Sequence, residues 1–445
     1  MDYNFDTIVA LITPMAKGAV GIVRMSGPKA FEIAKKVFSR EIKPKMINYG
    51  HILDKNNNKL DEIILLPFVA PHSYTGEDVI EFQTHGSMTI INELIEILLS
   101  YGARIADKGE FTKRAFLNHR IDLSQAEAVM DIIESKSVKS AQNSLSNLDG
   151  YLKNKINNLK EDLINLYSKL IATIDFPEDV AEIDKNYVVS ICTDKMTEIK
   201  SILDNSKSHN FIRDGISACL IGCPNVGKSS LFNALLNYNR SIVTNIEGTT
   251  RDTINESINL DGYLINFIDT AGVRDKKNAD IVEKIGIDNS IETIKNSEIV
   301  IFLFEKDKSE IDNSLLDLAE DKNVIFVQTK ADLGNKADEE AILISSKTGF
   351  GIDKLKEKIK EIITKLSPND TNYTTNKRQQ GLLARCYESL ENVINTANSD
   401  LYMDECADLY TLDLKQAILE LDELTGEVLT DKILDNIFSH FCIGK

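Results

Sequence analysis

Eight consecutive residues, 222–229 (GCPNVGKS), fit the phosphate-binding pattern G-x-x-x-x-G-K-S/T and constrain the fold more than any other segment. An apolar run at 216–221 predicts a strand before them, and a helical pattern opens at Ser230 and Leu231. Strand, loop and helix in this order predict the phosphate site of an α/β domain, with Lys228 as its positive charge and the Ser229 hydroxyl as a ligand for Mg²⁺. The residues predicted here to bind nucleotide are Asn225, Val226, Gly227, Lys228, Ser229 and Ser230.

Two motifs between this loop and residue 272 fit the metal and γ-phosphate side of such a site. The first, residues 248–252 (GTTRD), lies in a stretch with little hydrophobic period and would supply Mg²⁺ with a second hydroxyl, that of Thr250. The second, residues 269–272 (DTAG), follows an apolar run at 264–268; there Asp269 would hold Mg²⁺ through water and the Gly272 N–H would contact the γ-phosphate. The predicted nucleotide contacts are Thr244, Asn245, Ile246, Glu247, Gly248, Thr249, Thr250, Asp269, Thr270, Ala271 and Gly272.

The next two motifs indicate which base is bound. Asp332 follows a predicted strand at 324–327, and a carboxylate there accepts from the N1 and N2 donors of guanine, a pair that adenine lacks. The predicted base contacts are Thr329, Lys330, Asp332, Ser345, Ser346 and Lys347. All five motifs follow in order, so we expect a site for GTP and GDP. GTPases usually have asparagine where this chain has Thr329, and since threonine can still tether the loop, we expect weaker nucleotide binding rather than another base.

Composition predicts a cytoplasmic chain of several domains. At 445 residues it is too long for one ordinary core, and no apolar run approaches the length of a membrane span. Six scattered cysteines without a C-x-x-C pair, and no apparent signal peptide, indicate a reducing compartment. The net charge of −18 argues against general nucleic-acid binding, so any such contact would be local or supplied by a partner.

Glycine and proline usage suggests four segments. Residues 1–120 hold five of the eight prolines with mixed strand and helix patterns, so they predict an α+β module. Residues 121–213 and 369–445 have helical periodicity, including a predicted capping box from Ser124 to Glu127 and a face shared by Leu123, Ala126, Met130 and Ile133. Residues 214–368 alternate strand and helix. The simplest architecture is one helical domain interrupted by an inserted Ras-like P-loop domain, with two separate helical domains as the alternative.

These motifs and several longer strings resemble the MnmE (TrmE) family of tRNA-modification GTPases over essentially the full chain. The strings are residues 6–9 (DTIV), 21–27 (GIVRMSG), 73–81 (SYTGEDVIE), 109–118 (GEFTKRAFLN), 121–128 (IDLSQAEA) and 442–445 (CIGK). The resemblance implies a homodimer through an N-terminal module that binds a tetrahydrofolate derivative, 5-formyl or methylene, as one-carbon donor. It also implies a heterotetramer with an FAD-dependent partner of the MnmG (GidA) family, which modifies C5 of the wobble uridine of certain tRNAs with a carboxymethylaminomethyl or aminomethyl group.

The resemblance further implies potassium-dependent hydrolysis of GTP, with K⁺ held by Asn225, Thr244, Ile246 and Thr249 and Mg²⁺ by Ser229 and Thr250. Ras-like GTPases orient the attacking water with a glutamine after D-x-x-G, where this chain has apolar Val273. The family uses a glutamate slightly downstream. The matching string at 282–286 (VEKIG) makes Glu283 the catalytic candidate, beside Lys228.

For folate, the resemblance assigns Arg24, Glu81, Arg120 and Lys445, with arginine at 120 replacing a lysine common in the family. Cys442 is a candidate for the modification chemistry or a small buried thiol. If all four residues serve one pocket, the C-terminal tail must fold back on the N-terminal module of its own or a partner subunit. The alternative function is a GTP-dependent assembly or regulatory switch, which would need neither a folate pocket nor this tail.

Overall fold

The computed structural model describes residues 6–176, 178–179, 183–238, 256–268, 291–334, 338–366, 373–399 and 403–445. By internal contacts the chain divides into two compact units. Unit 1 comprises residues 1–130, 148–168 and 414–445, and unit 2 comprises residues 131–147 and 169–413. Helices α6 (Tyr151–Asp175) and α15 (Met403–Thr425) run through both units. The domain boundaries at 120, 213 and 368 remain a prediction.

A six-stranded sheet of order β3-β4-β5-β2-β1-β6 forms the N-terminal part of unit 1. The strands are β1 (Ile8–Leu11), β2 (Val20–Ser26), β3 (Asn48–Leu53), β4 (Lys59–Phe68), β5 (Val79–His85) and β6 (Arg104–Ile105). All neighbours are antiparallel except β6, which pairs parallel with β1.

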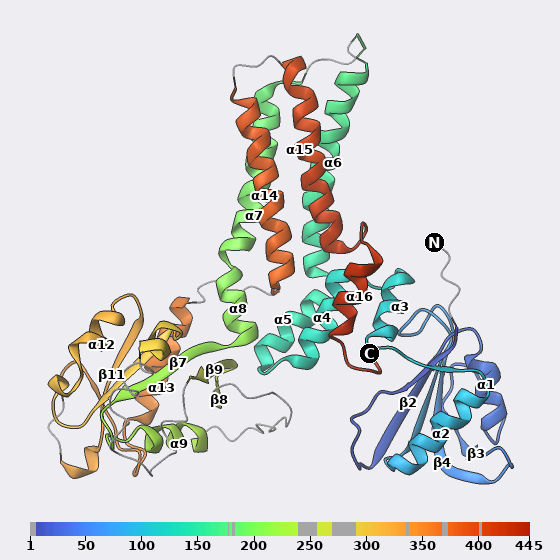
Figure 1. Cartoon of the computed structure of the whole chain (residues 1–445), viewed down its shortest axis with the longest axis horizontal. Helices are drawn as coiled ribbons and strands as arrows, with labels where there is room; N and C mark the ends of the chain where they lie inside the picture. Colours follow the sequence, from blue (N-terminus) through green and yellow to red (C-terminus); the bar gives the residue numbers. More distant parts are fainter. Residues whose placement is uncertain are drawn as a thin grey trace. The chain divides into compact units, whose positions relative to one another are not determined.

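Helices α1 (Ala30–Val37) and α2 (Met88–Ser100) cover one face of this sheet (Figure 1). Each presents apolar residues at three- and four-residue spacing, and these pack on Val23 and Met25 of β2 in one core. Side chains alternate between the two faces of a strand, so Arg24 points to the opposite face. Glu81 is its register partner on β5 and shares that face.

Arg114, on α3 (Glu110–Leu117), is buried in a polar network on the face of the sheet opposite to α1 and α2. Its guanidinium donates to Asp6 Oδ1 at 2.9 Å, to Glu110 Oε1 at 2.8 Å and to Glu77 Oε1 at 3.2 Å. Glu77 Oε2 in turn accepts from the Ser26 hydroxyl at 2.6 Å. A buried charge is tolerated when it is paired in this way, and the pairing ties α3 to β2 and to the loop before β5.

Unit 2 contains a second six-stranded sheet, of order β12-β11-β10-β7-β9-β8. The strands are β7 (Ile216–Gly222), β8 (Glu256–Leu260), β9 (Tyr263–Phe267), β10 (Ile299–Phe304), β11 (Asn323–Gln328) and β12 (Ile342–Leu343). All pairs are parallel except the β8–β9 hairpin. Helices α9 (Lys228–Tyr238) and α13 (Ile352–Leu366) pack on one face and α12 (Asn313–Leu318) on the other, each over its own apolar core.

The remaining elements are mainly helical. They are α4 (Leu123–Glu134), α5 (Val138–Leu148), α7 (Lys185–Asp204), α8 (Ser206–Asp214), α14 (Lys377–Ala397), α16 (Asp431–Ser439) and the 3-10 turns η1 (Lys308–Glu310) and η2 (Ala331–Leu333). In unit 2, α7 packs along α14 (Figure 1), where Leu383, Cys386 and Leu390 are buried. Among the described residues, no helix is both long enough and apolar enough to cross a membrane.

The predicted capping box of α4, from Ser124 to Glu127, was wrong, although helical structure does begin at Leu123. The helix begins at Leu123, and its reciprocal cap joins Asp122 to Gln125: the Gln125 N–H donates to Asp122 Oδ1 at 2.8 Å, and the Asp122 N–H to Gln125 Oε1 at 3.0 Å. Ser124 donates its hydroxyl to Asp122 instead of capping. Asp and Gln serve as well as Ser and Glu in this motif, so two overlapping candidates existed. Ile133, placed on the apolar face, is 44% exposed.

The Arg114 network predicts a specific loss of stability in acid. The guanidinium groups of Arg104, chiefly, and Arg114 lower the pKa of Asp6 from 3.8 to about 2. A carboxyl whose pKa is lower in the folded state stabilises that state above pH 3.8, and this contribution disappears as pH falls through about 2. We therefore expect Asp6→Asn to lower the thermal unfolding midpoint at pH 5, and the gap to wild type to narrow steadily toward pH 2. A gap that is constant with pH would contradict the assignment.

Candidate functional site

The carboxyl edge of the parallel strands in unit 2 carries those sequence-predicted nucleotide residues that lie in the described part of the chain. Strand β7 leads into the phosphate loop at 223–227, β11 leads to Thr329, and β12 leads to Ser345. Because β7, β10, β11 and β12 are parallel, their ends meet at one edge. Ligands of open α/β sheets bind at that edge.

The phosphate loop has the backbone that its sequence requires. At Gly222 an added Cβ would lie 2.4 Å from the Leu303 carbonyl oxygen, so only glycine allows β7 this close to β10. Asn225 and Gly227 have positive φ angles of 63° and 110°, which curl the chain before α9 begins at Lys228. The helix starts two residues earlier than predicted. Its first N–H groups therefore belong to the loop and provide a site for an anion.

Lys228 lies inside this loop. Its Nζ donates to the Gly222 carbonyl at 2.6 Å and to the Cys223 carbonyl at 3.1 Å. Burial lowers the pKa of the Lys228 ammonium, so an arriving anion would favour its charged form. The geometry is compatible with the phosphate contact predicted for Lys228, and that role stays a prediction.

Residues 329–334, here called the base loop, are held by hydrogen bonds at two positions, Thr329 and Asp332. The Thr329 hydroxyl donates to the Val226 carbonyl at 2.7 Å, so the threonine makes the tether to the phosphate loop expected of it. Asp332 Oδ1 accepts from the Ser345 hydroxyl at 2.7 Å. That bond, chiefly, lowers the pKa of Asp332, and the charges of Lys347 and Lys330 add to it. The base loop thus presents an ionised carboxylate at the edge of the site.

One contact of the base loop was not predicted. The Lys330 ammonium pairs with the carboxylate of Glu305, the first residue after β10. The signal was present in the sequence, since an acidic residue directly follows the apolar run that forms β10. Ser346 is half-buried and Lys347 is exposed beside Asp332.

Part of the predicted site lies outside the described residues. This applies to Thr244, Asn245, Ile246, Glu247, Gly248, Thr249, Thr250, Asp269, Thr270, Ala271, Gly272 and Glu283. Their assignments stay predictions.

In unit 1, Arg24 and Glu81 form an ion pair, with 2.8 Å between Nε and Oε1. Their side chains are only 13% and 14% exposed, so the pair is shielded from solvent. The Arg24 guanidinium also lies 5.0 Å from the centre of the Tyr74 ring and 5.5 Å from that of Phe111. Aromatic faces and a carboxylate together hold the cation in place.

Tyr74 joins Arg24 to Arg120. The Arg120 guanidinium lies 5.3 Å from the same ring and donates to the Tyr74 carbonyl at 2.8 Å. The Tyr74 hydroxyl is hydrogen-bonded to Thr112 on α3 at 2.8 Å. Tyr74 was within a recognised string but was not predicted as a site residue, because its role depends on two arginines distant in sequence.

The C-terminal tail, residues 442–445, lies against the same region of its own chain. The N–H groups of Gly109 and Phe111, at the start of α3, donate to the carbonyls of Cys442 at 3.3 Å and Lys445 at 3.1 Å. Lys108 and Ile443 form an antiparallel bridge. Gly444, with φ of 99°, approaches β1 so closely that a Cβ would lie 2.5 Å from the Leu11 carbonyl oxygen. The expected return of the tail is therefore made within one chain.

Lys445 is the third cation of this cluster. Burial and then the positive charge of Arg24 lower the pKa of its ammonium, while Cys442 and Glu81 oppose that shift. Cys442 itself has an exposed free thiol, so the buried-thiol alternative does not apply. Arg24, Arg120 and Lys445 thus concentrate positive charge locally in a chain of net charge −18. We call Arg24, Tyr74, Glu81, Arg120 and Lys445 the cationic cluster.

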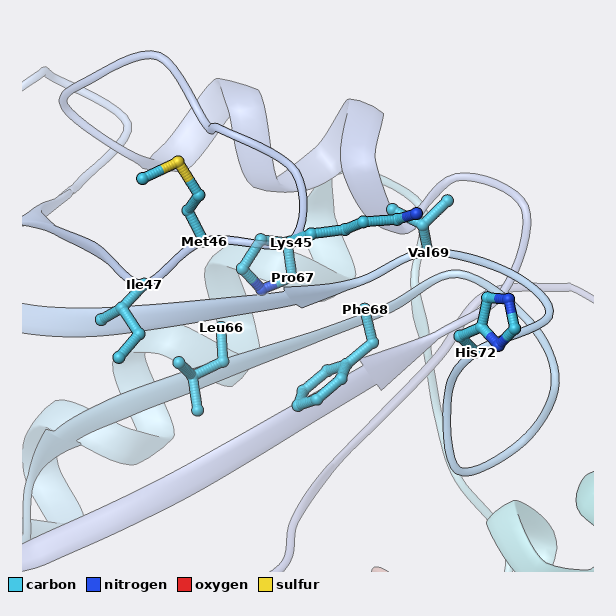
Figure 2. A pocket seen from close by; sticks show the side chains of 8 residues that line it. All are labelled: Lys45, Met46, Ile47, Leu66, Pro67, Phe68, Val69 and His72. Carbon is cyan, nitrogen blue, oxygen red and sulfur yellow. The ribbon is translucent and has the colours of Figure 1, made fainter.

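An apolar pocket of about 490 Å³ lies on β4 and the loop before β3 (Figure 2). Its lining residues are Lys45, Met46, Ile47, Leu66, Pro67, Phe68, Val69 and His72. None of them belongs to the predicted sites. Leu66 is the register partner of Glu81, so the pocket adjoins the row of the sheet that carries the cationic cluster.

Two family models match this chain, one over its N-terminal part and one over the rest. The family model described as the GTP-binding protein TrmE N-terminus matches residues 7–120, and that of the MnmE helical domain matches residues 123–442. The second match encloses the P-loop sheet. The predicted fold class is confirmed: an N-terminal α+β module and a helical domain interrupted by a P-loop G domain.

Curated relatives extend over the full chain. The tRNA modification GTPase MnmE of Streptococcus thermophilus (strain CNRZ 1066) is 40% identical over 458 residues, 99% of each chain. That of Streptococcus sanguinis (strain SK36) is 39% identical over 463 residues, again 99% of each chain. With its phosphate loop, base loop and N-terminal module in place, this chain belongs to the MnmE (TrmE) family, whose curated members are named tRNA modification GTPases.

Proposed function

We propose that this protein is a potassium-dependent GTPase that modifies C5 of the wobble uridine of certain tRNAs. In this proposal a tetrahydrofolate derivative supplies a one-carbon unit, and an FAD-containing MnmG (GidA) family protein acts with it in a heterotetramer. The product carries a carboxymethylaminomethyl or aminomethyl group. The protein works as a homodimer in the cytoplasm. GTP hydrolysis, with GTP, GDP and Mg²⁺ as ligands, is the activity that family membership supports.

The cationic cluster is the observation that carries the folate part. A folate has glutamyl carboxylates at one end and a flat pterin with N–H donors at the other. Arg120 and Lys445 suit the carboxylates, and the exposed Arg120 has a planar guanidinium with several N–H donors. Glu81 contacts Arg24 through Oε1, and a carboxylate has a second oxygen that can accept from the pterin. The exposed Cys442 thiol lies on the tail that adjoins this cluster.

The phosphate loop supports the hydrolysis part. Lys228 would contact the β- and γ-phosphates, and Ser229 at the start of α9 offers a hydroxyl suited to Mg²⁺. Asn225 is exposed on the loop, where its amide oxygen suits a hard cation such as K⁺. A bound K⁺ would supply positive charge near the scissile bond in place of an arginine.

Glu283 is proposed to orient the attacking water through a bridging water, a role that apolar Val273 cannot fill. A Glu283→Ala enzyme should lose roughly 100-fold in kcat with little change in GTP affinity. Turnover at the wild-type rate would return Glu283 to an ordinary surface carboxylate.

Potassium dependence is expected in the rate of GTP hydrolysis. Turnover in KCl should exceed turnover in NaCl at least about tenfold, because the smaller Na⁺ fits the same oxygen cage poorly. Asn225→Ala should remove the difference while GDP binding stays near normal. Asn233→Ala, an exposed amide farther along α9, is the matched control and should keep the salt preference. Equal wild-type rates in the two salts would rule out the proposal.

The Thr329 tether predicts a loss of nucleotide affinity. Thr329→Val keeps the branched shape of a residue that is 2% exposed but removes the donor to the Val226 carbonyl. Losing one neutral hydrogen bond should weaken GDP binding by about 1 kcal/mol, or roughly fivefold. Fluorescent GDP titration measures this, with Thr329→Ser as the control that retains the hydroxyl. Wild-type affinity in the valine variant would show that the tether does not support binding.

Removal of the tail separates the two halves of the proposed function. A chain lacking residues 442–445 should bind 5-formyltetrahydrofolate at least about tenfold more weakly, because Lys445 is lost from the cluster. It should also fail to support uridine modification, yet hydrolyse GTP at nearly the normal rate. Lys445→Met tests the charge alone, and Lys432→Met, an exposed cation on α16, is its control. Normal folate binding without the tail would favour the GTP-dependent switch.

A further inference from the structure

Glu305 connects the base loop to the centre of the unit 2 sheet. It directly follows β10, and its carboxylate pairs with the ammonium of Lys330. The two side chains are 28% and 35% exposed, so the pair is partly shielded from water and salt. Lys330 lies between Thr329 and Asp332, whose own anchors are on the phosphate loop and on Ser345. The ion pair therefore anchors the middle of the base loop together with the hydrogen bond from the Ala331 N–H to the Ile344 carbonyl.

The backbone of Lys330 needs such an anchor. Its φ and ψ angles are 59° and 43°, in the left-handed region that residues with a side chain rarely adopt. This conformation reverses the chain between β11 and η2, which lets the Ala331 N–H donate to the Ile344 carbonyl at 3.0 Å. It also brings Asp332 to Ser345. A lysine that relaxed from this conformation would move the carboxylate that reads the base.

Glu305 is itself rigidly held. Its N–H donates to Glu310 Oε2 at 3.0 Å, and the Lys306 N–H donates to Glu310 Oε1 at 2.9 Å. On the other side, Gln328 Nε2 on β11 donates to the Glu305 carbonyl at 3.4 Å. Fixed between the η1 turn and β11, the residue provides a stationary negative charge for Lys330.

We infer that Glu305 is a positioning residue for guanine-nucleotide binding, acting through Lys330 on the base loop. The inference rests on the proposed guanine site at Asp332 and adds a residue to which no role had been assigned. The ion pair holds the base loop in its nucleotide-binding conformation before nucleotide arrives, so the loop loses less conformational entropy on binding. Without the carboxylate, the partly shielded ammonium of Lys330 loses its partner at Glu305, and the left-handed turn loses a support.

The test is nucleotide affinity measured separately from turnover. Glu305→Gln, which keeps the size of the side chain, should weaken binding of fluorescent GDP about tenfold, as expected for a charge-assisted contact. KM for GTP should rise by a similar factor and kcat should stay within about twofold, because uniform binding alone is affected. Glu340→Gln is the matched control, since it removes a 73% exposed carboxylate from Lys308 nearby and should leave both constants unchanged.

A double-mutant cycle distinguishes positioning from a general structural role. In a Lys330→Met background, Glu305→Gln should cause little further loss of GDP affinity, because the partner through which it acts is gone. An equal loss in both backgrounds, or wild-type affinity in the single variant, would overturn the inference. A lower kcat together with a lower thermal midpoint of the nucleotide-free protein would also overturn it, by showing general damage to the domain.

A separate variant shows whether a negative result disproves only the inference about Glu305 or the proposed guanine site as well. Asp332→Asn should shift preference from GTP toward XTP, because an amide donates to the xanthine oxygen where the carboxylate accepted from guanine. If this shift occurs while Glu305→Gln has no effect, only the inference about Glu305 is wrong. If Asp332→Asn leaves base preference unchanged, the proposed guanine site is wrong, and the inference that rests on it falls as well.

Discussion

The first N–H groups of helix α3 cannot find partners within their own helix, and this requirement organises unit 1. Gly109 and Phe111 donate to carbonyls of the tail, more than 300 residues away in sequence. That pairing seats Gly444 against β1 and puts Lys445 close enough to Arg24 for their charges to interact. A backbone constraint of one short helix thus assembles a cluster of side chains from both ends of the chain.

Beneath this surface, Arg114 makes the arrangement rigid. Its buried guanidinium is shared by Asp6, Glu77 and Glu110, so α3, the loop before β5 and the segment leading to β1 are joined by charge-assisted bonds. Removing any carboxylate would leave a buried cation only partly paired, which is costly. Tyr74 is hydrogen-bonded to Thr112 of α3, and its ring contacts the guanidinium groups of both Arg24 and Arg120.

Both candidate sites attract anions in a strongly acidic chain, and each does so by local geometry rather than net charge. In unit 2, curled backbone and a helix start surround one lysine, and the base loop presents an ionised carboxylate beside them. In unit 1, the helix start is occupied by the tail, and the positive charge comes from side chains stacked on an aromatic ring. Each arrangement would therefore favour a ligand that matches its local geometry and charge.

Local patterns were enough to predict the strand, loop and helix around Lys228, because these depend on neighbours in sequence. They also predicted the strand ends at Thr329 and Ser345 and the tether from Thr329, because parallel strands end at one edge of a sheet. The cap of α4 was misplaced because Asp122–Gln125 and Ser124–Glu127 both fit the motif locally, and only packing selected the first. Tyr74 was not predicted because its partners Arg24 and Arg120 are distant in sequence. Glu305 carried a local signal, an acidic residue directly after the β10 run, but its pairing with Lys330 depends on the alignment of two strands. The sequence by itself determined which elements form and which chemistry their ends carry. Only the tertiary structure decided which side chains meet, since ion pairs and ring contacts depend on distances that strand register, helix packing and the docked tail impose.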